Sequence, residues 1–237
     1  MTMDAGLDRQ NHAFLQIENL KKGYEEGGKY HVVLHDFSVA FRRGEFVAVL
    51  GRSGSGKTTL LNLVSGIDRA DGGEITLDGT RLTGLDDQQR TLYRRQNIGF
   101  IFQFFNLIPT LTVWENVTLP LELSGKFDAA GKQRALDLLA EVGLADRLNA
   151  FPDRISGGEQ QRVSIARALV HDPHLVLADE PTGNLDEDTG RAVMDLLDRL
   201  TRRAGKNLIL VTHSPEAAAY ADRVFTLHDG HLVEKAR

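Results

Sequence analysis

One segment constrains this chain more than any other: residues 51–58 read Gly-Arg-Ser-Gly-Ser-Gly-Lys-Thr. They match the pattern G-x-x-x-x-G-K-[ST], whose glycines let the backbone curl and turn its N–H groups toward phosphate oxygens. An apolar run over residues 46–50 precedes the segment, and a helical pattern over residues 59–65 follows it. This strand–loop–helix order predicts a phosphate site at the N-terminus of a helix in an α/β protein.

Two side chains of this loop have distinct predicted roles. Lys57 places a point charge near the β- and γ-phosphates, and the hydroxyl of Thr58 can ligate Mg²⁺. The residues expected to hold the phosphates and their neighbourhood are Gly51, Ser53, Gly54, Ser55, Gly56, Lys57, Thr58 and Thr59.

A second apolar run, residues 175–178, ends in Asp179 and Glu180. Acids at the carboxyl end of a buried parallel strand lie at the crevice where α/β folds bind ligands. We predict that Asp179 holds Mg²⁺, directly or through a water molecule, and that Glu180 polarises the attacking water, an effect typically worth about 10²–10⁴-fold in rate.

The hydropathy pattern predicts two kinds of sheet. Residues 14–20 and 32–41 alternate apolar and polar residues, and residues 74–79 end in an Asp-Gly turn, which together indicate an antiparallel sheet. The continuous apolar runs at 46–50, 175–178 and 208–211 indicate parallel strands buried on both faces.

Residues 87–162 break this rhythm. They are rich in helix formers, notably over 132–142, and show no comparable strand run, so we interpret them as a helical insertion. A terminal hairpin is expected at residues 224–233, turning at Asp229-Gly230.

Composition excludes several classes of protein. The 237 residues suffice for one α/β domain with an insertion, and a net charge of −5 argues against a general nucleic-acid binder. The chain has no cysteine, which excludes disulfides, thiolate zinc sites and cysteine nucleophiles. Its apolar runs are far shorter than the ~20 residues of a membrane span, so no direct membrane insertion is expected. The polar residues 1–13 are expected to be a disordered tail.

The discriminating segment is residues 155–162, Ile-Ser-Gly-Gly-Glu-Gln-Gln-Arg. Ser156 and Glu159 fit a capping box that opens a helix over residues 160–170. That interpretation does not explain Gly157 and Gly158, which weaken a first helical turn. Both glycines make sense if a phosphate must approach the backbone closely.

This segment closely resembles the signature of the ATP-binding cassette (ABC) ATPases, and the resemblance covers residues 14–233. It implies a RecA-like P-loop NTPase core with an antiparallel β subdomain, over about 14–86 and 163–237, and an inserted helical subdomain over about 87–162. It also implies roles for single residues. Tyr24 would stack on adenine, Gln103 would contact Mg²⁺ and the attacking water, and His213 would contact the γ-phosphate. Asp186, in the loop 183–186, would lie at a dimer interface.

The family resemblance also implies an assembly. The phosphate loop of one copy would face Ser156, Gly157, Gly158 and Glu159 of a second copy, so two copies would enclose two MgATP and hydrolyse them. A separate integral membrane permease would be the other partner, placing the chain peripherally on the cytoplasmic face of the inner membrane.

Residues 102–121 are unusually apolar, and with the run Glu-Asn-Val-Thr-Leu-Pro-Leu at 115–121 they resemble the lipoprotein-release and macrolide-export group. In that group the permease has four transmembrane helices and works by mechanotransmission. Phe104, Phe105 and Leu107 are the residues we expect to be exposed for the permease. Two alternatives stay open: an ATPase of a small-solute importer, or a non-transport ABC ATPase such as a cell-division regulator.

Overall fold

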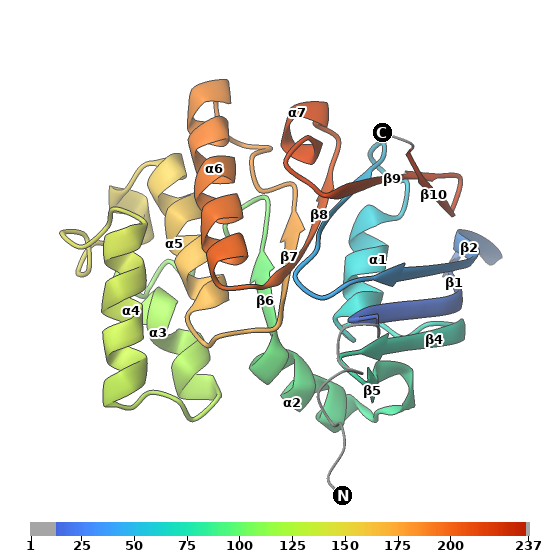
Figure 1. Cartoon of the computed structure of the whole chain (residues 1–237), viewed down its shortest axis with the longest axis horizontal. Helices are drawn as coiled ribbons and strands as arrows, with labels where there is room; N and C mark the ends of the chain where they lie inside the picture. The colour runs from blue at the N-terminus through green and yellow to red at the C-terminus, as the bar shows by residue number, and fades with distance from the viewer. Residues whose placement is uncertain (1–12, 236–237) are drawn as a thin grey trace, which may run out of the picture.

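The computed structural model describes residues 13–235, which form two β-sheets and the helices around them (Figure 1). The larger sheet has six strands in the order β10-β9-β3-β8-β7-β6, and the smaller has four in the order β2-β1-β4-β5. Of the predicted disordered tail, residues 1–12 lie outside the described residues. Figure 1 shows α1 (Lys57–Val64) between the two sheets and α3 to α6 on the other side of the larger sheet.

The central strands are buried on both faces, as their continuous apolar runs predict. β3 (Phe46–Leu50) pairs in parallel with β8 (Asn207–Thr212), which pairs in parallel with β7 (Leu175–Asp179). Alternate residues enter different cores: Ala48 packs in the cluster shared with the helical side, whereas Val49 packs in the cluster shared with α1. Because side chains alternate across a strand, only an unbroken apolar sequence can supply both cores.

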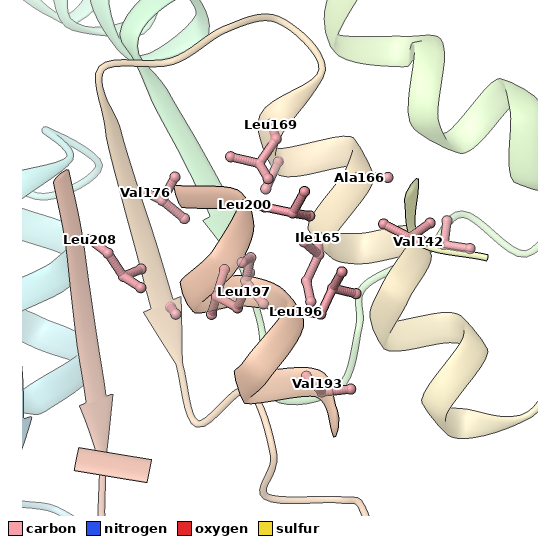
Figure 2. Close-up of a cluster of buried hydrophobic side chains, with 14 of the residues drawn as sticks. Val142, Ile165, Ala166, Leu169, Val176, Val193, Leu196, Leu197, Leu200 and Leu208 are labelled. Atoms are coloured by element: carbon pink, nitrogen blue, oxygen red, sulfur yellow. The ribbon is translucent and has the colours of Figure 1, made fainter. Parts of the chain in front are cut away.

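The helical side is held by a single apolar cluster. It joins α3 (Val113–Leu123), α4 (Ala129–Glu141), α5 (Gly157–Leu169) and α6 (Glu187–Arg203) to the sheet. In Figure 2, side chains of α5 and α6 meet Val142 on one side and strands β7 and β8 on the other. The labelled members are Val142, Ile165, Ala166, Leu169, Val176, Val193, Leu196, Leu197, Leu200 and Leu208.

The smaller sheet is antiparallel, as the alternating patterns predict. It comprises β1 (Leu15–Glu26), β2 (Lys29–Phe41), β4 (Gly72–Leu77) and the two-residue β5 (Thr80–Arg81).

Both predicted Asp-Gly turns are present. Asp78 and Gly79 have φ of 47° and 77°, and Asp229 and Gly230 have 47° and 74°. The second pair joins β9 (Arg223–His228) to β10 (His231–Glu234), which confirms the terminal hairpin.

The expectation that residues 87–162 contain no strand was wrong. After α2 (Asp87–Asn97) the chain enters β6 (Ile98–Ile101), which pairs in parallel with β7. Gly99 masks the strand pattern, and packing requires it, because a Cβ there would lie 2.1 Å from the carbonyl oxygen of Ala168. β6 leads directly to Gln103, so this strand positions a predicted site residue.

Candidate active site

The phosphate loop joins β3 to α1 and takes a conformation that needs glycine. Gly54 and Gly56 have φ of 78° and 97°, in the left-handed region. A Cβ on Gly56 would also lie 2.8 Å from Cγ1 of Val33. The loop and the first turn of α1 border a cleft of about 720 Å³.

The cleft collects most of the residues predicted to serve the nucleotide. The lining residues that were predicted are Tyr24, Ser53, Gly54, Gly56, Lys57, Thr58, Thr59, Gln103, Asp179, Glu180 and His213. Three further lining residues were not predicted: Glu26, Val33 and Arg52. Glu26 and Val33 lie on the β1–β2 hairpin, which contains no motif that would indicate them. Arg52 occupies an unspecified position of the phosphate-loop pattern.

Gly51 and Ser55 do not line this cleft but lie within the loop. A Cβ on Gly51 would approach Oγ of Ser55 to 2.4 Å and the carbonyl oxygen of Leu227 to 2.9 Å. The structure therefore gives Gly51 a packing role that is independent of phosphate.

Lys57 is held at the mouth of the loop by the loop itself. Its side chain is 8% exposed, and Nζ donates to the carbonyl oxygens of Gly51 at 2.8 Å and Arg52 at 3.0 Å. Nζ also lies 3.7 Å from Oε1 of Glu180. The ammonium thus lies between the phosphate loop and the acid at the end of β7.

Thr58 and Asp179 form a set of oxygen atoms suited to a hard cation. The Thr58 hydroxyl donates to Oδ2 of Asp179 at 2.8 Å. Burial raises the pKa of Asp179, and the neighbouring Glu180 charge adds to this, while the Thr58 hydrogen bond and Lys57 oppose it. Hydroxyl and carboxylate oxygens fit Mg²⁺, which keeps several waters and uses phosphate oxygens as ligands. Within residues 13–235 no three acid or histidine side chains cluster as a metal site, so such ligands would have to complete the shell.

Glu180 is anchored through both its backbone and its carboxylate. Its φ is 46°, and its N–H donates to the carbonyl oxygen of Val211 at 2.9 Å. Oε2 accepts from the Thr212 hydroxyl at 3.0 Å and from the backbone N–H of His213 at 3.2 Å. Oε1 lies 2.9 Å from Nδ1 of His213. A non-glycine residue in the left-handed region is a strained conformation typical of functional sites.

Gln103 links two predicted loops. Its carbonyl oxygen accepts from Nδ2 of Asn184 at 2.8 Å, and a Cβ on Gly183 would lie 2.9 Å from its Nε2. The loop 183–186 therefore packs directly on Gln103. A side chain at position 183 would therefore displace the Gln103 amide, a coupling that the sequence motif did not predict.

Arg167 is a supporting residue that no sequence motif indicates. Its guanidinium donates to the carbonyl oxygens of Phe105 at 2.7 Å and Asn106 at 2.6 Å. Both residues have positive φ, 62° and 48°. The side chain comes from α5, so the signature helix fixes the segment that follows Gln103.

The predicted exposed apolar surface is only partly correct. Phe104 is 71% exposed, as expected. Phe105 and Leu107 are half-buried, and Leu107 packs against the helical-side core, so their predicted exposure was wrong. Ile108, which was not predicted, is 37% exposed.

The signature residues form the predicted capping box. The backbone N–H and hydroxyl of Ser156 each donate to Oε2 of Glu159 at 2.8 Å, and the N–H of Glu159 donates back to Oγ of Ser156 at 3.3 Å. A Cβ on Gly158 would lie 2.6 Å from Cγ2 of Thr189, whereas one on Gly157 would meet only ordinary contacts at 3.7 Å. Packing therefore explains why residue 158 is glycine, but it does not explain the glycine at position 157.

The signature and Asp186 do not line the cleft. None of Ser156, Gly157, Gly158 and Glu159 is among the described residues that line it. Asp186 is also absent from its lining and caps α6 instead, accepting from the N–H of Thr189 at 3.0 Å. A single chain thus brings together the phosphate loop, the two acids, Gln103 and His213, but not the signature.

The chain is similar to known proteins. Residues 34–183 match the family described as ABC transporter. An uncharacterised ABC transporter ATP-binding protein of Mycobacterium tuberculosis (strain ATCC 25618 / H37Rv) is 56% identical over 219 residues, 92% of this chain and 88% of the relative. The lipoprotein-releasing system ATP-binding protein LolD of Legionella pneumophila (strain Lens) is 44% identical over 94% of this chain and 98% of its own.

A solved structure of a similar chain is dimeric. The dimeric post-hydrolysis state of the ATP-binding cassette MJ0796, bound to ADP and Pi, superimposes with a TM-score of 0.85 at 40% identity. The match covers 93% of this chain and 97% of that one.

Proposed function

Because this chain belongs to the ABC transporter ATP-binding family, an ATPase family, we propose that two copies enclose two MgATP and drive a separate membrane permease. The permease is of the lipoprotein-release or macrolide-export type, with four transmembrane helices, and works by mechanotransmission. The chain lies on the cytoplasmic face of the inner membrane, held by that permease.

The proposal rests on the separation, within one chain, of the residues predicted to bind the nucleotide. The phosphate loop and Glu180 line one cleft, while Ser156 and Gly157 lie outside it. A second copy related by a twofold axis completes both sites at once. The dimeric MJ0796 structure, which holds ADP and Pi, supports this arrangement.

In the proposed reaction the chain's residues bind the nucleotide, orient the attacking water and accept a proton. Lys57 and the loop N–H groups bind the β- and γ-phosphates, and His213 and Gln103 position the γ-phosphate and the attacking water. Glu180, which lies 3.7 Å from the Lys57 ammonium and 2.9 Å from His213, polarises that water. Thr58 and Asp179, with Gln103 nearby, would hold Mg²⁺, which would supply charge neutralisation at the phosphoryl group.

A groove on the helical side supports the permease assignment. It has a volume of about 440 Å³ and lies between α2, β6, α3 and α5. Phe100, Phe102, Leu119 and Leu123 contribute apolar lining, and Leu123 is 53% exposed. No helix within residues 13–235 has the length and apolarity to cross a bilayer. A helix of the permease packed in this groove would transmit the ATP cycle to the membrane.

The composite site is tested with Glu180→Gln. This variant should bind MgATP, hydrolyse it about 10²- to 10⁴-fold more slowly, and accumulate as a dimer in size-exclusion chromatography with light scattering. The double variant Glu180→Gln with Gly157→Glu is the control, because the added side chain should prevent closure. A Glu180→Gln protein that binds MgATP but remains monomeric would contradict the shared site.

The type of permease is tested by purifying the tagged chain from gently solubilised native membranes. Recovery of a permease with four transmembrane helices and a large extracytoplasmic domain supports the proposed group, whose relatives include the lipoprotein-releasing protein LolD. A permease with more helices would favour a small-solute importer. Recovery from the soluble fraction alone would favour a non-transport ATPase such as a cell-division regulator.

A further inference from the structure

A partly buried polar network surrounds Tyr24, the residue proposed to stack on adenine. The Tyr24 hydroxyl donates to Oδ2 of Asp68 at 2.7 Å. Lys22, which is 7% exposed, donates from Nζ to Oδ1 of Asp68 at 3.0 Å and to the carbonyl oxygen of Arg69 at 2.8 Å. One carboxylate therefore binds the tip of the ring with one oxygen and a buried ammonium with the other.

The same ammonium covers one face of the ring. Nζ of Lys22 lies 4.7 Å from the centroid of Tyr24, within the range of a cation–π interaction. Its bonds to Asp68 and to the Arg69 carbonyl hold it there. Since Tyr24 also lines the nucleotide cleft, only its other face is available to a base.

Asp71 holds the strand on which Tyr24 lies. Its Oδ2 accepts from the backbone N–H of Gly23 at 2.7 Å and from the hydroxyl of Tyr30 at 2.6 Å. A Cβ on Gly23 would lie 2.6 Å from the Tyr30 ring, so glycine is required for this packing. The backbone and the side chain of the Tyr24 region are thus each bonded to an aspartate that follows α1.

These aspartates connect the ring to the phosphate loop. The N–H of Asp68 donates to the carbonyl oxygen of Asn62 in α1 at 3.1 Å, and α1 begins at Lys57. Asp68, which bonds the tip of the base platform, is therefore tied to the helix that begins in the phosphate site. A fixed distance between the base platform and the phosphate site would select ligands that carry both a base and a triphosphate.

We propose that Asp68, with Lys22, is the positioning residue that locks the Tyr24 ring as a one-faced platform for the nucleotide base. This inference rests on the proposed function, because it needs ATP in the cleft. Asp68 touches neither the base nor the phosphates; it acts through Tyr24. Its loss should weaken recognition of the base and leave recognition of the triphosphate intact.

The test measures binding of MgATP and of Mg²⁺ tripolyphosphate, which lacks the base, by calorimetry on the full chain. Asp68→Asn and Tyr24→Phe should each weaken ATP binding about threefold to tenfold, the range expected for a hydrogen bond to a charged group in a partly exposed site. Tripolyphosphate binding should change less than twofold. In steady-state hydrolysis, Asp68→Asn should raise KM for ATP and change kcat less than twofold.

The double variant Asp68→Asn with Tyr24→Phe should bind ATP no more weakly than the weaker-binding single variant, because Asp68→Asn removes the carboxylate acceptor and Tyr24→Phe removes the hydroxyl donor of one charge-assisted bond. Asp36→Asn is the matched control, since Asp36 pairs with Lys21 at 3.1 Å on the same hairpin with both side chains more than half exposed. If Asp68→Asn fails to fold, Tyr24→Phe alone tests the proposal, because this variant removes only one hydroxyl.

Equal loss of ATP and tripolyphosphate, or additive effects in the double variant, would overturn the locking role while the ATPase assignment stands. A wild-type chain that binds ATP no better than tripolyphosphate would overturn the base platform itself, and with it this inference. Failure of the wild-type chain to bind either ligand would instead overturn the proposed function.

Discussion

Nδ1 of His213 lies 2.9 Å from Oε1 of Glu180, so the residue after β8 orients the acid that follows β7. The histidine side chain is 67% exposed and the glutamate 12% exposed. The acid is therefore fixed from the protein side, whereas the imidazole remains accessible to a ligand in the cleft. This geometry assigns the two residues to one functional unit.

We predict that His213→Ala lowers kcat for ATP hydrolysis by about 10²-fold, the lower end of the range for a positioned acid–base group. The double variant with Glu180→Gln should be little worse than the more damaging single variant, because the two residues act together. His174→Ala is the control, since His174 pairs with Asp78 at 3.1 Å and precedes the opposite end of β7. Phosphate-release assays give the rates. If the kcat losses of the two single variants multiply in the double variant, His213 and Glu180 do not act together.

The Thr58–Asp179 bond leads to a prediction about metal dependence. Thr58→Val keeps the shape of the side chain and removes the hydroxyl that donates to Asp179 at 2.8 Å. The Mg²⁺ concentration that gives half-maximal ATPase activity should rise about tenfold, the scale for loss of one metal-shell interaction. Thr58→Ser should restore it. If Thr58→Val and Thr58→Ser show the same Mg²⁺ dependence, Thr58 does not hold the metal.

The sequence predicted the core of the site because its motifs are local. Residues 51–58 fold around their own backbone, and Asp179 and Glu180 follow a strand whose apolar pattern is unbroken. The chemistry of such loops depends on neighbours in the sequence, which a motif records. Their position at one sheet edge then follows from parallel pairing.

The residues that the sequence missed act across long separations. Arg167 bonds carbonyl oxygens some sixty positions earlier, and Asp68 bonds a tyrosine on another strand. β6 was missed because Gly99, needed for contact with Ala168, interrupts its pattern. Phe105 and Leu107 were expected on the surface because their burial depends on the start of α5 and on the helical-side core, which no local pattern specifies.

Arg167 leads to a prediction about the segment after Gln103. Arg167→Met removes two charge-assisted bonds to backbone carbonyls and should lower the free energy of unfolding by about 2–3 kcal/mol. Hydrogen exchange should accelerate over residues 102–108. Burial lowers the pKa of Arg167 to about 10, so the guanidinium is charged at neutral pH.

Two variants test whether the shape of Arg167 matters. Arg167→Lys should recover only part of the loss, because a single ammonium does not reproduce the planar fork that binds both carbonyls. Arg191→Met is the control. Arg191 pairs with Glu187 at 3.0 Å on the exposed face of α6, and loss of this pair should lower the free energy of unfolding by about 0.5 kcal/mol or less. An equal loss of unfolding free energy in Arg167→Met and Arg191→Met, measured by urea unfolding, would show that Arg167 does not stabilise the segment after Gln103.

His171 leads to a prediction about pH. Its side chain is buried, Nε2 lies 3.2 Å from the carbonyl oxygen of Ile98, and Nδ1 has no hydrogen-bond partner among the described residues. Burial lowers its pKa to about 4. In the unfolded chain the pKa of histidine is about 6.5, so below that pH the unfolded state binds a proton that the folded state excludes.

The folded state should therefore lose stability as pH falls from 6.5 toward 4, by about 2 kcal/mol between pH 7.5 and 5 from this group. In His171→Asn the loss should disappear, so the difference in unfolding free energy between the wild-type chain and the variant should shrink as pH falls. His31→Asn, at an exposed position, should leave the pH profile of the wild-type chain unchanged. Urea unfolding at four pH values measures this, and a difference that stays constant from pH 7.5 to 5 would show that His171 is protonated equally in both states.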